Sequence, residues 1–546
     1  MKKSFLSICS LLFLTPTFAQ WNSNTAVNLE LAALKTADIV AVATSNGGTY
    51  ICFYNQNSAT GNYDMRAQYI NASGVKQFGP DGILVGNKPS GSATYVFNAT
   101  VDNNNNLIVC YQDERNTSDG AVAYKISPAG LQLWGPDGIY LGPGLAPYPA
   151  VLTNGEVVIA WNGTNGNLFL QKITTGGVAA WASAIQISAS VAGRSLFRGQ
   201  VVPTTNGTFG MVYQERFANP NSTYLFAQRF NNDGTPIWSN PNQLGTYVGS
   251  AARYNSVLSY GDLMYCGYYA SPPAQSRLDA MLQRINGDGT LPWGANGVDF
   301  ATDNTYLETS MKISYSPASS FLWGISNLTN SAQSQVGVYV QKFDAATGAR
   351  QFTDNAKVIW PVSATRESQV SELALFNDQP VFAFNDVTNK IYGTALDGNG
   401  NFTLPGNKVD LASTTNAKGR YNFTANIGGQ SVLVWQENKG VEDRAYAQNM
   451  VATIITGINP LTNDKSFISK VFPTVGGKTI YFRIGNRADV KSIFIEINDV
   501  LGQTVYSQKA AYQNGWFDLD GLARGTYFLR IVSDNEKYQF IQKLVF

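Results

Sequence analysis

The stretch Phe226-Ala-Gln-Arg-Phe-Asn-Asn-Asp-Gly-Thr-Pro-Ile-Trp238 decides the architecture of this chain. Its apolar start predicts a β-strand, and Asn-Asp-Gly at residues 232–234 predicts a tight turn in which Gly234 takes a positive φ. Trp238 is expected to open a second strand. Variants of this hairpin recur along most of the chain, so we interpret it as one copy of a structural repeat.

The repeat can be followed through the residues that align with Gln228. They lie 47 to 58 residues apart and are Gln68, Tyr124, Gln171, Gln283, Gln341, Thr394 and Gln448. Each unit also holds an upstream apolar strand, such as Leu107–Asp113 or Phe209–Glu215, and an earlier, less regular one. Four short strands at this period are typical of propeller blades. The sequence predicts an all-β propeller of eight blades over residues 20–455, or seven if a weak unit is not a full blade.

The last repeat lacks its tryptophan strand, and a matching segment stands at the other end of the chain. The eighth unit runs from Gln448 into Val451–Thr456 without a tryptophan, whereas Trp21–Leu29 has a tryptophan followed by alternating apolar positions. We therefore expect Trp21–Leu29 to pair beside Arg444–Met450 and to close the ring. Closure would remove the exposed strand edges that favour aggregation.

Composition and the N-terminal residues limit the possible partners and the cellular location of the protein. With 14% charged residues, a net charge of +1 and no basic block, the chain is not expected to bind nucleic acid. Residues 1–19 have the pattern of a secretory signal peptide, with cleavage expected between Ala19 and Gln20, and no later stretch is long enough to span a bilayer. Three cysteines in separate repeats are predicted to be buried free thiols: Cys52, Cys110 and Cys266.

A second domain is expected after a turn-rich linker at residues 456–465. Residues 466–546 alternate between apolar and polar positions in short strands, which predicts a small β-sandwich. The strands are expected at residues 479–484, 493–500, 503–507, 526–533 and 539–546. Three motifs follow one another in it: Asn498-Asp-Val-Leu-Gly-Gln-Thr-Val505, Leu522-Ala-Arg-Gly-Thr-Tyr-Phe-Leu-Arg-Ile531 and Lys543-Leu-Val-Phe546.

These ordered motifs resemble the type A C-terminal sorting domain of the type IX (Por) secretion system of Bacteroidetes. Family members begin with a Pro-Asn-Pro element, whereas this chain has Val471-Phe-Pro-Thr-Val475. The resemblance implies an interaction with the type IX secretion machinery and passage through the periplasm to the medium or the outer-membrane surface. The residues that carry the resemblance are Pro473, Asp499, Gly502, Gly525, Tyr527 and Lys543.

The residues available for chemistry are limited. The chain has no histidine, which excludes a Ser-His-Asp triad and His-ligated zinc. Four acids follow an aromatic and an amide at the ends of upstream strands: Asp113, Glu215, Asp386 and Glu437. In a propeller such acids would encircle one mouth, where they could bind a sugar or a cation such as calcium, or supply an acid and a base. The sequence favours a structural role, in which they cap strands and pair with Arg115 or Arg216, and predicts no cofactor.

Two functions follow from these observations. The favoured one is a non-enzymatic secreted or surface propeller that binds a glycan or protein partner through its longer loops, at residues 113–120, 215–222 and 270–276. The alternative is a glycan-active hydrolase that uses an Asp/Glu pair. Two unpaired acids about 5–9 Å apart would favour the hydrolase, and acids bonded to arginine or backbone would favour the binding module.

Overall fold

The computed structural model describes residues 21–22, 24–57, 59–91, 96–218, 221–246, 253–271, 277–451, 467–473, 479–485, 488–499, 504–523, 525–534 and 538–545. The predicted signal peptide at 1–19, its cleavage site at Ala19 and Gln20, and the predicted linker at 456–465 lie outside these residues. Contacts divide the chain between Ile455 and Thr456 into two compact units, and each is considered by itself. Within the described residues, no helix is long and apolar enough to cross a membrane.

Over its described residues, the first unit consists of eight antiparallel sheets that follow one another along the chain. Sheets 1 to 4 have four strands each: β2 (Thr36–Ala43), β3 (Thr49–Gln56), β4 (Tyr63–Ile70) and β5 (Ile83–Leu84); β6 (Asn98–Val101), β7 (Leu107–Asp113), β8 (Gly120–Ile126) and β9 (Ile139–Pro143); β10 (Leu145–Val151), β11 (Val157–Asn162), β12 (Leu168–Ile173) and β13 (Ile185–Ile187); β14 (Arg194–Pro203), β15 (Phe209–Ala218), β16 (Asn221–Phe230) and β17 (Asn242–Gln243).

The remaining sheets keep this order, although sheets 6 and 7 have their first strand in two pieces. Sheets 5 to 8 are β18 (Arg253–Tyr260), β19 (Leu263–Ala270), β20 (Asp279–Ile285) and β21 (Val298–Asp299); β22 (Leu307–Glu308), β23 (Lys312–Ser316), β24 (Phe321–Thr329), β25 (Val336–Asp344) and β26 (Lys357–Ser363); β27 (Ser368–Gln369), β28 (Ala374–Phe376), β29 (Gln379–Asn385), β30 (Ile391–Ala395) and β31 (Val409–Ala412); and β32 (Lys418–Phe423), β33 (Gln430–Asn438), β34 (Asp443–Val451) and β1 (Leu29–Glu30).

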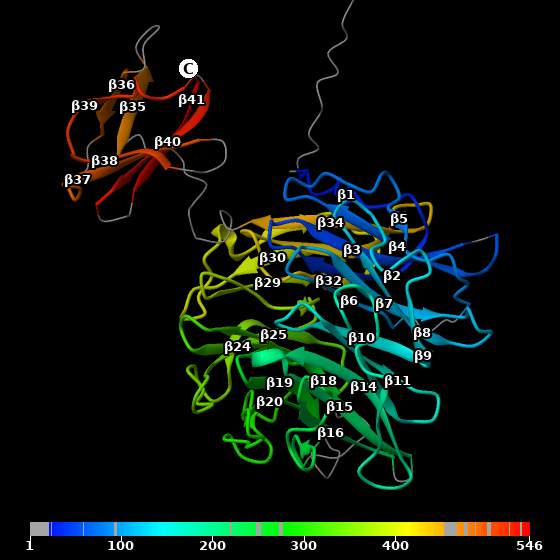
Figure 1. Ribbon diagram of the computed structural model, residues 1–546. Helices are drawn as coiled ribbons and strands as arrows, with labels where there is room; N and C mark the ends of the chain where they lie inside the picture. The colour runs from blue at the N-terminus through cyan, green and yellow to red at the C-terminus, as the bar shows by residue number, and fades with distance from the viewer. Residues whose placement is uncertain are drawn as a thin grey trace, which may run out of the picture. The chain divides into compact units, whose positions relative to one another are not determined.

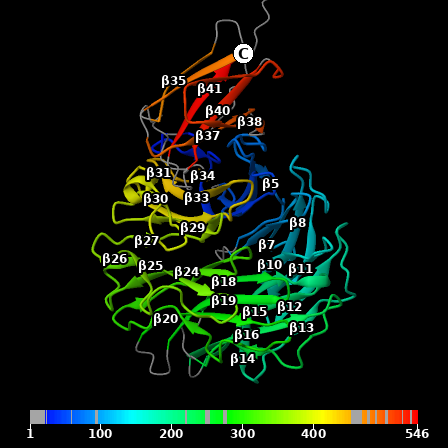
Figure 2. The ribbon, with the colours of Figure 1, turned by 90° about the vertical axis from the view of Figure 1, so that its left-hand side faces the viewer.

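The sheets are arranged as the blades of a propeller (Figure 1). Their first strands touch in the order β2, β6, β10, β14, β18, β23 and β28, sheet 7 meets sheet 8 through β31 and β34, and β32 touches β2. Figure 2 shows the end of the unit from a second side, with the yellow strands of sheets 7 and 8 next to the blue N-terminal strands. The ring is therefore closed by contacts between the last sheet and the first.

The N-terminal segment supplies the outer strand of sheet 8. Leu29 pairs with Ala447 and Glu30 with Tyr446, and the chain then continues into sheet 1. The strand is much shorter than the predicted Trp21–Leu29, because residues 24–28 form a turn and loop before the pairing begins. One continuous segment thus supplies a strand to the last sheet and then enters the first sheet, which links the two covalently.

The central strands are buried on both faces because each sheet is stacked between two others. All seven residues of β7 and of β8 are buried, which explains their nearly continuous apolar sequence. The three cysteines at 52, 110 and 266 lie in such strands as buried free thiols, as predicted, and burial raises their thiol pKa values. The repeated glutamine holds the segment after the third strand: Gln228 Nε2 donates to the carbonyl of Trp238 at 3.0 Å.

The repeated tryptophan has a different role from the one predicted. Trp238 does not open a strand; it packs on the turn of the next sheet, where its Nε1 donates to the carbonyl of Gly287 at 3.0 Å. Gly289 has a φ of +89°, and a Cβ there would lie 3.0 Å from the Trp238 ring, so this turn needs glycine. We call this contact the aromatic latch. Trp21 makes it from sheet 8 to the sheet 1 turn, with Nε1 donating to the carbonyl of Ala72 at 3.1 Å.

The second unit contains two sheets that share one hydrophobic cluster. Two of their strands, β35 and β39, are absent from the sequence prediction. The first sheet is β35 (Ile468–Pro473), β36 (Thr479–Ile484) and β39 (Gly515–Asp518), and the second is β38 (Thr504–Ala511), β37 (Ser492–Asn498), β40 (Thr526–Ser533) and β41 (Gln539–Val545).

Candidate functional site

The four acids singled out from the sequence lie at the same end of their sheets, where the second strand turns into the third. Asp113 is the last residue of β7, Glu215 lies within β15, Asp386 directly follows β29, and Glu437 lies within β33. Since all the sheets run in the same sense around the ring, these hairpins and the connections between sheets belong to one face. This face is where the sequence places a ligand site.

Asp113 and Glu215 are fully buried, and each is held by an arginine. Arg115 binds Asp113 through Nε and Oδ1 at 2.9 Å and through Nη2 and Oδ2 at 2.7 Å. Glu215 accepts the hydroxyl of Ser190 at 2.9 Å and pairs with Nη1 of Arg194 at 3.2 Å. These bonds occupy both carboxylates inside the protein. The expected partner Arg115 is confirmed, but Glu215 is held by Arg194 and not by Arg216.

Glu437 is also engaged within its own sheet. Trp435 Nε1 donates to its Oε2 at 2.9 Å, and Lys418 Nζ lies 3.4 Å from its Oε1. Burial by itself raises the pKa of Glu437, but hydrogen bonds from Thr414 and Trp435 and the charge of Lys418 outweigh it and leave the pKa below its ordinary value. Glu437 is therefore ionised near neutral pH and suited to a structural role.

Asp386 is the most accessible of the four acids, being half-buried. Its Oδ1 accepts the backbone N–H of Thr388 at 2.8 Å and the Thr388 hydroxyl at 2.5 Å, which closes a local turn. Among the interactions of the described residues, no partner is shared by any two of the four acids. They thus act as four separate local supports.

Three pockets each include residues of a loop between second and third strands. One, of about 560 Å³, lies between sheets 3 and 4 and includes Arg216; another, of about 350 Å³, includes Asp386. The third, of about 430 Å³, lies where the N-terminal segment meets the β33–β34 hairpin, and we call it the seam pocket. Its lining residues are Ala26, Val27, Asn28, Glu30, Lys439, Val441, Glu442, Arg444 and Tyr446.

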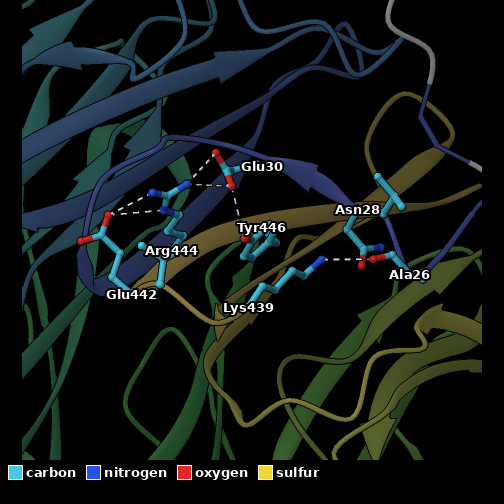
Figure 3. Close-up of a pocket in the computed structure, with 9 residues that line it drawn as sticks. Ala26, Asn28, Glu30, Lys439, Glu442, Arg444 and Tyr446 are labelled. Carbon is cyan, nitrogen blue, oxygen red and sulfur yellow. Dashed lines mark hydrogen bonds and ion pairs between the residues drawn. The ribbon is translucent and has the colours of Figure 1, made fainter.

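The seam pocket has a fixed polar wall (Figure 3). Arg444 lies between two carboxylates, with Nη1 at 3.4 Å from Glu30 and Nη2 at 3.2 Å from Glu442. The Tyr446 hydroxyl donates to Glu30 at 3.2 Å, and burial, followed by the charge of Glu30, raises the pKa of Tyr446 to about 12. Lys439 Nζ lies 4.3 Å above the Tyr446 ring. The wall therefore carries two positive and two negative groups, and ion pairs join three of them, Glu30, Glu442 and Arg444.

The seam pocket was not predicted from the sequence, because its two sides are about four hundred residues apart in the chain. One spacing in the sequence does mark the place of this pocket. In sheets 1 to 6 the fourth strand begins four or five positions after the latch aromatic, whereas β1 begins eight positions after Trp21. The additional residues form one side of the pocket. Of the loops favoured in the sequence, residues 219–220 and 272–276 lie outside the described residues.

A second group that the sequence did not single out consists of the carboxyls of Asp279, Asp299 and Glu308, at sheets 5 and 6. Arg277 pairs with Asp279 at 2.6 Å, and Glu308 accepts the backbone N–H of Ala280 at 2.7 Å. Burial, and then the charge of Asp279, raises the pKa of Asp299 to about 6; burial raises that of Glu308 well above its ordinary value. Asp299 and Glu308 therefore keep their protons at a higher pH than ordinary carboxyls do. Within the described ranges, no cluster of three or more His, Cys, Asp or Glu side chains is placed to hold a metal ion.

The residues of the predicted sorting motif occupy defined places in the second unit. Tyr527 is buried in the core and donates its hydroxyl to the carbonyl of Ala523 at 3.0 Å, whereas Phe528 on the other face is 41% exposed. Pro473 ends β35, Asp499 directly follows β37, Gly525 directly precedes β40, and Lys543 in β41 pairs with Phe528 in β40. Gly502 lies outside the described residues.

Comparison with known families identifies the end of the chain. Residues 470–546 match the family described as the secretion system C-terminal sorting domain. This match marks the protein as exported through the type IX machinery, with which the domain interacts, and places it at the cell surface or in the medium. No curated protein matches the chain.

The first unit has structural relatives at low sequence identity. An ulvan lyase of polysaccharide lyase family PL25 covers 78% of this chain and 95% of its own, with 8% identity and a TM-score of 0.44. The propeller of Dos1 covers 77% and 94%, with 9% identity and a TM-score of 0.44. The β-propeller domain of the trilobed protease of Pyrococcus furiosus covers 77% and 96%, with 9% identity and a TM-score of 0.37.

Proposed function

We propose that this exported protein is a non-catalytic binding module whose propeller takes a glycan or protein ligand on the face that carries the loops between second and third strands. The single observation that carries the proposal is the engagement of the four conspicuous acids. Asp113, Glu215 and Glu437 are buried and bonded to cationic or hydroxyl groups, and Asp386 closes a turn. A pair that catalyses glycoside hydrolysis needs two carboxyls that reach the same bond, about 5–9 Å apart.

The pockets on this face suit binding. They measure about 350 to 560 Å³ and are open. The pocket with Asp386 is lined mainly by polar residues, and the other two combine apolar with polar or charged side chains. Pockets of this size are typical of small-molecule and short oligomer sites. A rigid ring that presents several loops on one face also allows an extended ligand to contact more than one pocket.

A glycan-active hydrolase is the second candidate, and the carboxyls of Asp279, Asp299 and Glu308 favour it. A carboxyl with a raised pKa beside a second carboxyl is what a general acid and its partner need. Against this, Glu308 is only 2% exposed and Asp279 5%, so a substrate would not reach them without a rearrangement. We therefore place binding first.

The proposal is tested with the purified chain on an array of neutral and acidic oligosaccharides, and by capture of proteins from the natural surroundings of the host. Binding without turnover of the bound glycan is the expected result. Product formation that disappears in Glu308→Gln and Asp299→Asn would establish the hydrolase instead. Since we propose binding without a cofactor, chelation of calcium with EDTA should leave the affinity unchanged.

A further inference from the structure

The seam pocket combines several features of a ligand site and joins residues from the two ends of the propeller chain. One side is the additional loop before β1, at residues 24–28, and the other is the β33–β34 hairpin. Figure 3 shows two polar groups in the pocket: Glu30, Arg444 and Glu442 lie together, and Lys439 reaches toward Ala26 beside Asn28. A ligand there would touch both ends of the propeller chain.

The pocket contains a polar atom that lacks a partner. Asn28 is 6% exposed, and its Nδ2 donates to the carbonyl of Leu411 at 2.8 Å and to Gln448 at 3.2 Å. Its Oδ1 is buried and accepts no hydrogen bond from any described residue. Figure 3 shows this amide beside the contact of Lys439 with Ala26. Because buried acceptors in native proteins are almost always satisfied, this oxygen is open to a donor such as a water molecule or a ligand hydroxyl.

The other polar groups add both donors and acceptors. Arg444 binds only Oε1 of Glu442, through Nε at 3.3 Å and Nη2 at 3.2 Å, so Oε2 keeps its lone pairs. Lys439 has three N–H donors, and its contacts with the Ala26 carbonyl at 3.3 Å and with Glu437 at 4.0 Å are long. Hydroxyl groups, which donate and accept at once, match this set.

Charge and shape narrow the class of ligand further. The wall contains Glu30 and Glu442 against Lys439 and Arg444, so its formal charge is zero and it offers no net attraction to an anion or a cation. Val27 is 55% exposed and Val441 79% exposed, and both line the pocket. Apolar side chains beside fixed polar groups suit the C–H face and the hydroxyl edge of a sugar ring.

We propose that the seam pocket is a binding site for a neutral saccharide, and that binding there holds the propeller ring closed. This inference rests on the proposed binding function and assigns it a place and a ligand class. The bound sugar bridges residues 26–30 and 439–446, so it binds the closed seam and not the open one. By mass action, ligand at a hundred times its Kd lowers the population of the open seam about a hundredfold.

The test uses the full chain with cellobiose, maltose, mannobiose and xylobiose as probes, and with digalacturonate as the acidic counterpart. Calorimetry gives Kd for the wild type and for Glu442→Gln and Lys439→Gln. Matched controls are Asp354→Asn, which breaks the exposed pair with Arg350, and Lys88→Gln, which breaks the exposed pair with Asp137. We expect a rise in Kd of at least tenfold in the first two variants and no change in the controls.

Hydrogen exchange with the same sugar gives the second measurement. Protection should increase at Leu29–Leu31 and at Asp443–Tyr446, about a hundredfold at saturating sugar, and not in the loops near Arg216. A sugar that binds with unchanged Kd in both pocket variants, or that protects other loops, overturns the seam site and leaves the binding function intact. Binding of digalacturonate alone overturns the neutral ligand class. If no saccharide binds and only a protein is captured, the inference fails while a protein-binding function stands.

Discussion

The aromatic latch of Trp21 is expected to control how often the ring opens at its seam. Trp21→Ala removes the ring that packs on Gly74 and the bond from Nε1 to the Ala72 carbonyl at 3.1 Å. A fully buried tryptophan removes about 150–250 Å² from water, so the half-buried ring of Trp21 removes roughly 75–125 Å², worth about 2–3 kcal/mol at about 25 cal/mol per Å². The lost hydrogen bond adds about 1 kcal/mol. The free energy needed to open the seam should therefore fall by about 3–4 kcal/mol.

Native-state hydrogen exchange measures this opening directly. The amide of Leu31 donates to the carbonyl of Ala445 at 2.9 Å, and that of Ser413 to the carbonyl of Thr25 at 3.0 Å, so both report on the seam. If the free energy of opening falls by about 3 kcal/mol, these two amides should exchange faster by roughly two orders of magnitude.

Trp238→Ala is the matched control for this measurement, because it removes the same latch between two sheets inside the ring. It should accelerate exchange around sheets 4 and 5 and leave the amides of Leu31 and Ser413 unchanged. If Trp21→Ala leaves those two amides as well protected as in the wild type, the tryptophan does not hold the seam and the reasoning is refuted.

Three further predictions concern the acids and export. Asp113→Asn leaves Arg115 without its counter-charge and should lower the free energy of unfolding in urea by about 2–4 kcal/mol, against less than about 1 kcal/mol for Asp386→Asn; equal losses would contradict the difference in burial. The pKa of Asp299 is raised to about 6, so the folded chain holds this proton more tightly than the unfolded chain, and the stability from this group is present at low pH and lost as the pH rises through about 6. Asp299→Asn should therefore raise the melting temperature at pH 7 and change it little at pH 4. A change in melting temperature that does not depend on pH would contradict this prediction. Removal of residues 466–546 should leave a folded propeller in the periplasm, detected by fractionation and protease resistance, and normal secretion of the shortened chain would argue against the sorting role.

The repeats allowed much of the fold to be predicted, because burial on both faces leaves a clear apolar pattern. Leu107–Asp113 was expected as a strand from its sequence and is one in the structure. The tryptophans were misread as strand starts, since nothing within one repeat shows that Trp238 packs on the turn at Gly289 of the next sheet. The strand Gly515–Asp518 was missed because it is too short to show a period.

The candidate site was less accessible to sequence reasoning. The four acids attracted attention because they recur, and recurrence here reflects a shared structural support at the end of a strand. The seam pocket, by contrast, departs from the repeat in a single spacing before β1. Its polar atoms come together only when Asn28 meets Gln448 and Glu30 meets Arg444, contacts that no local pattern encodes.

The short strand β1 also sets the order in which the chain can fold. Leu29 and Glu30 are made near the start of synthesis, yet their partners Ala447 and Tyr446 are made after nearly all the other blades. Pairings across so long a stretch of chain form slowly, because the entropy of closing the loop is lost before the contact is gained. A nascent chain therefore cannot complete its ring before the eighth sheet is made. The last sheet of the propeller is therefore also the one whose folding completes the ring.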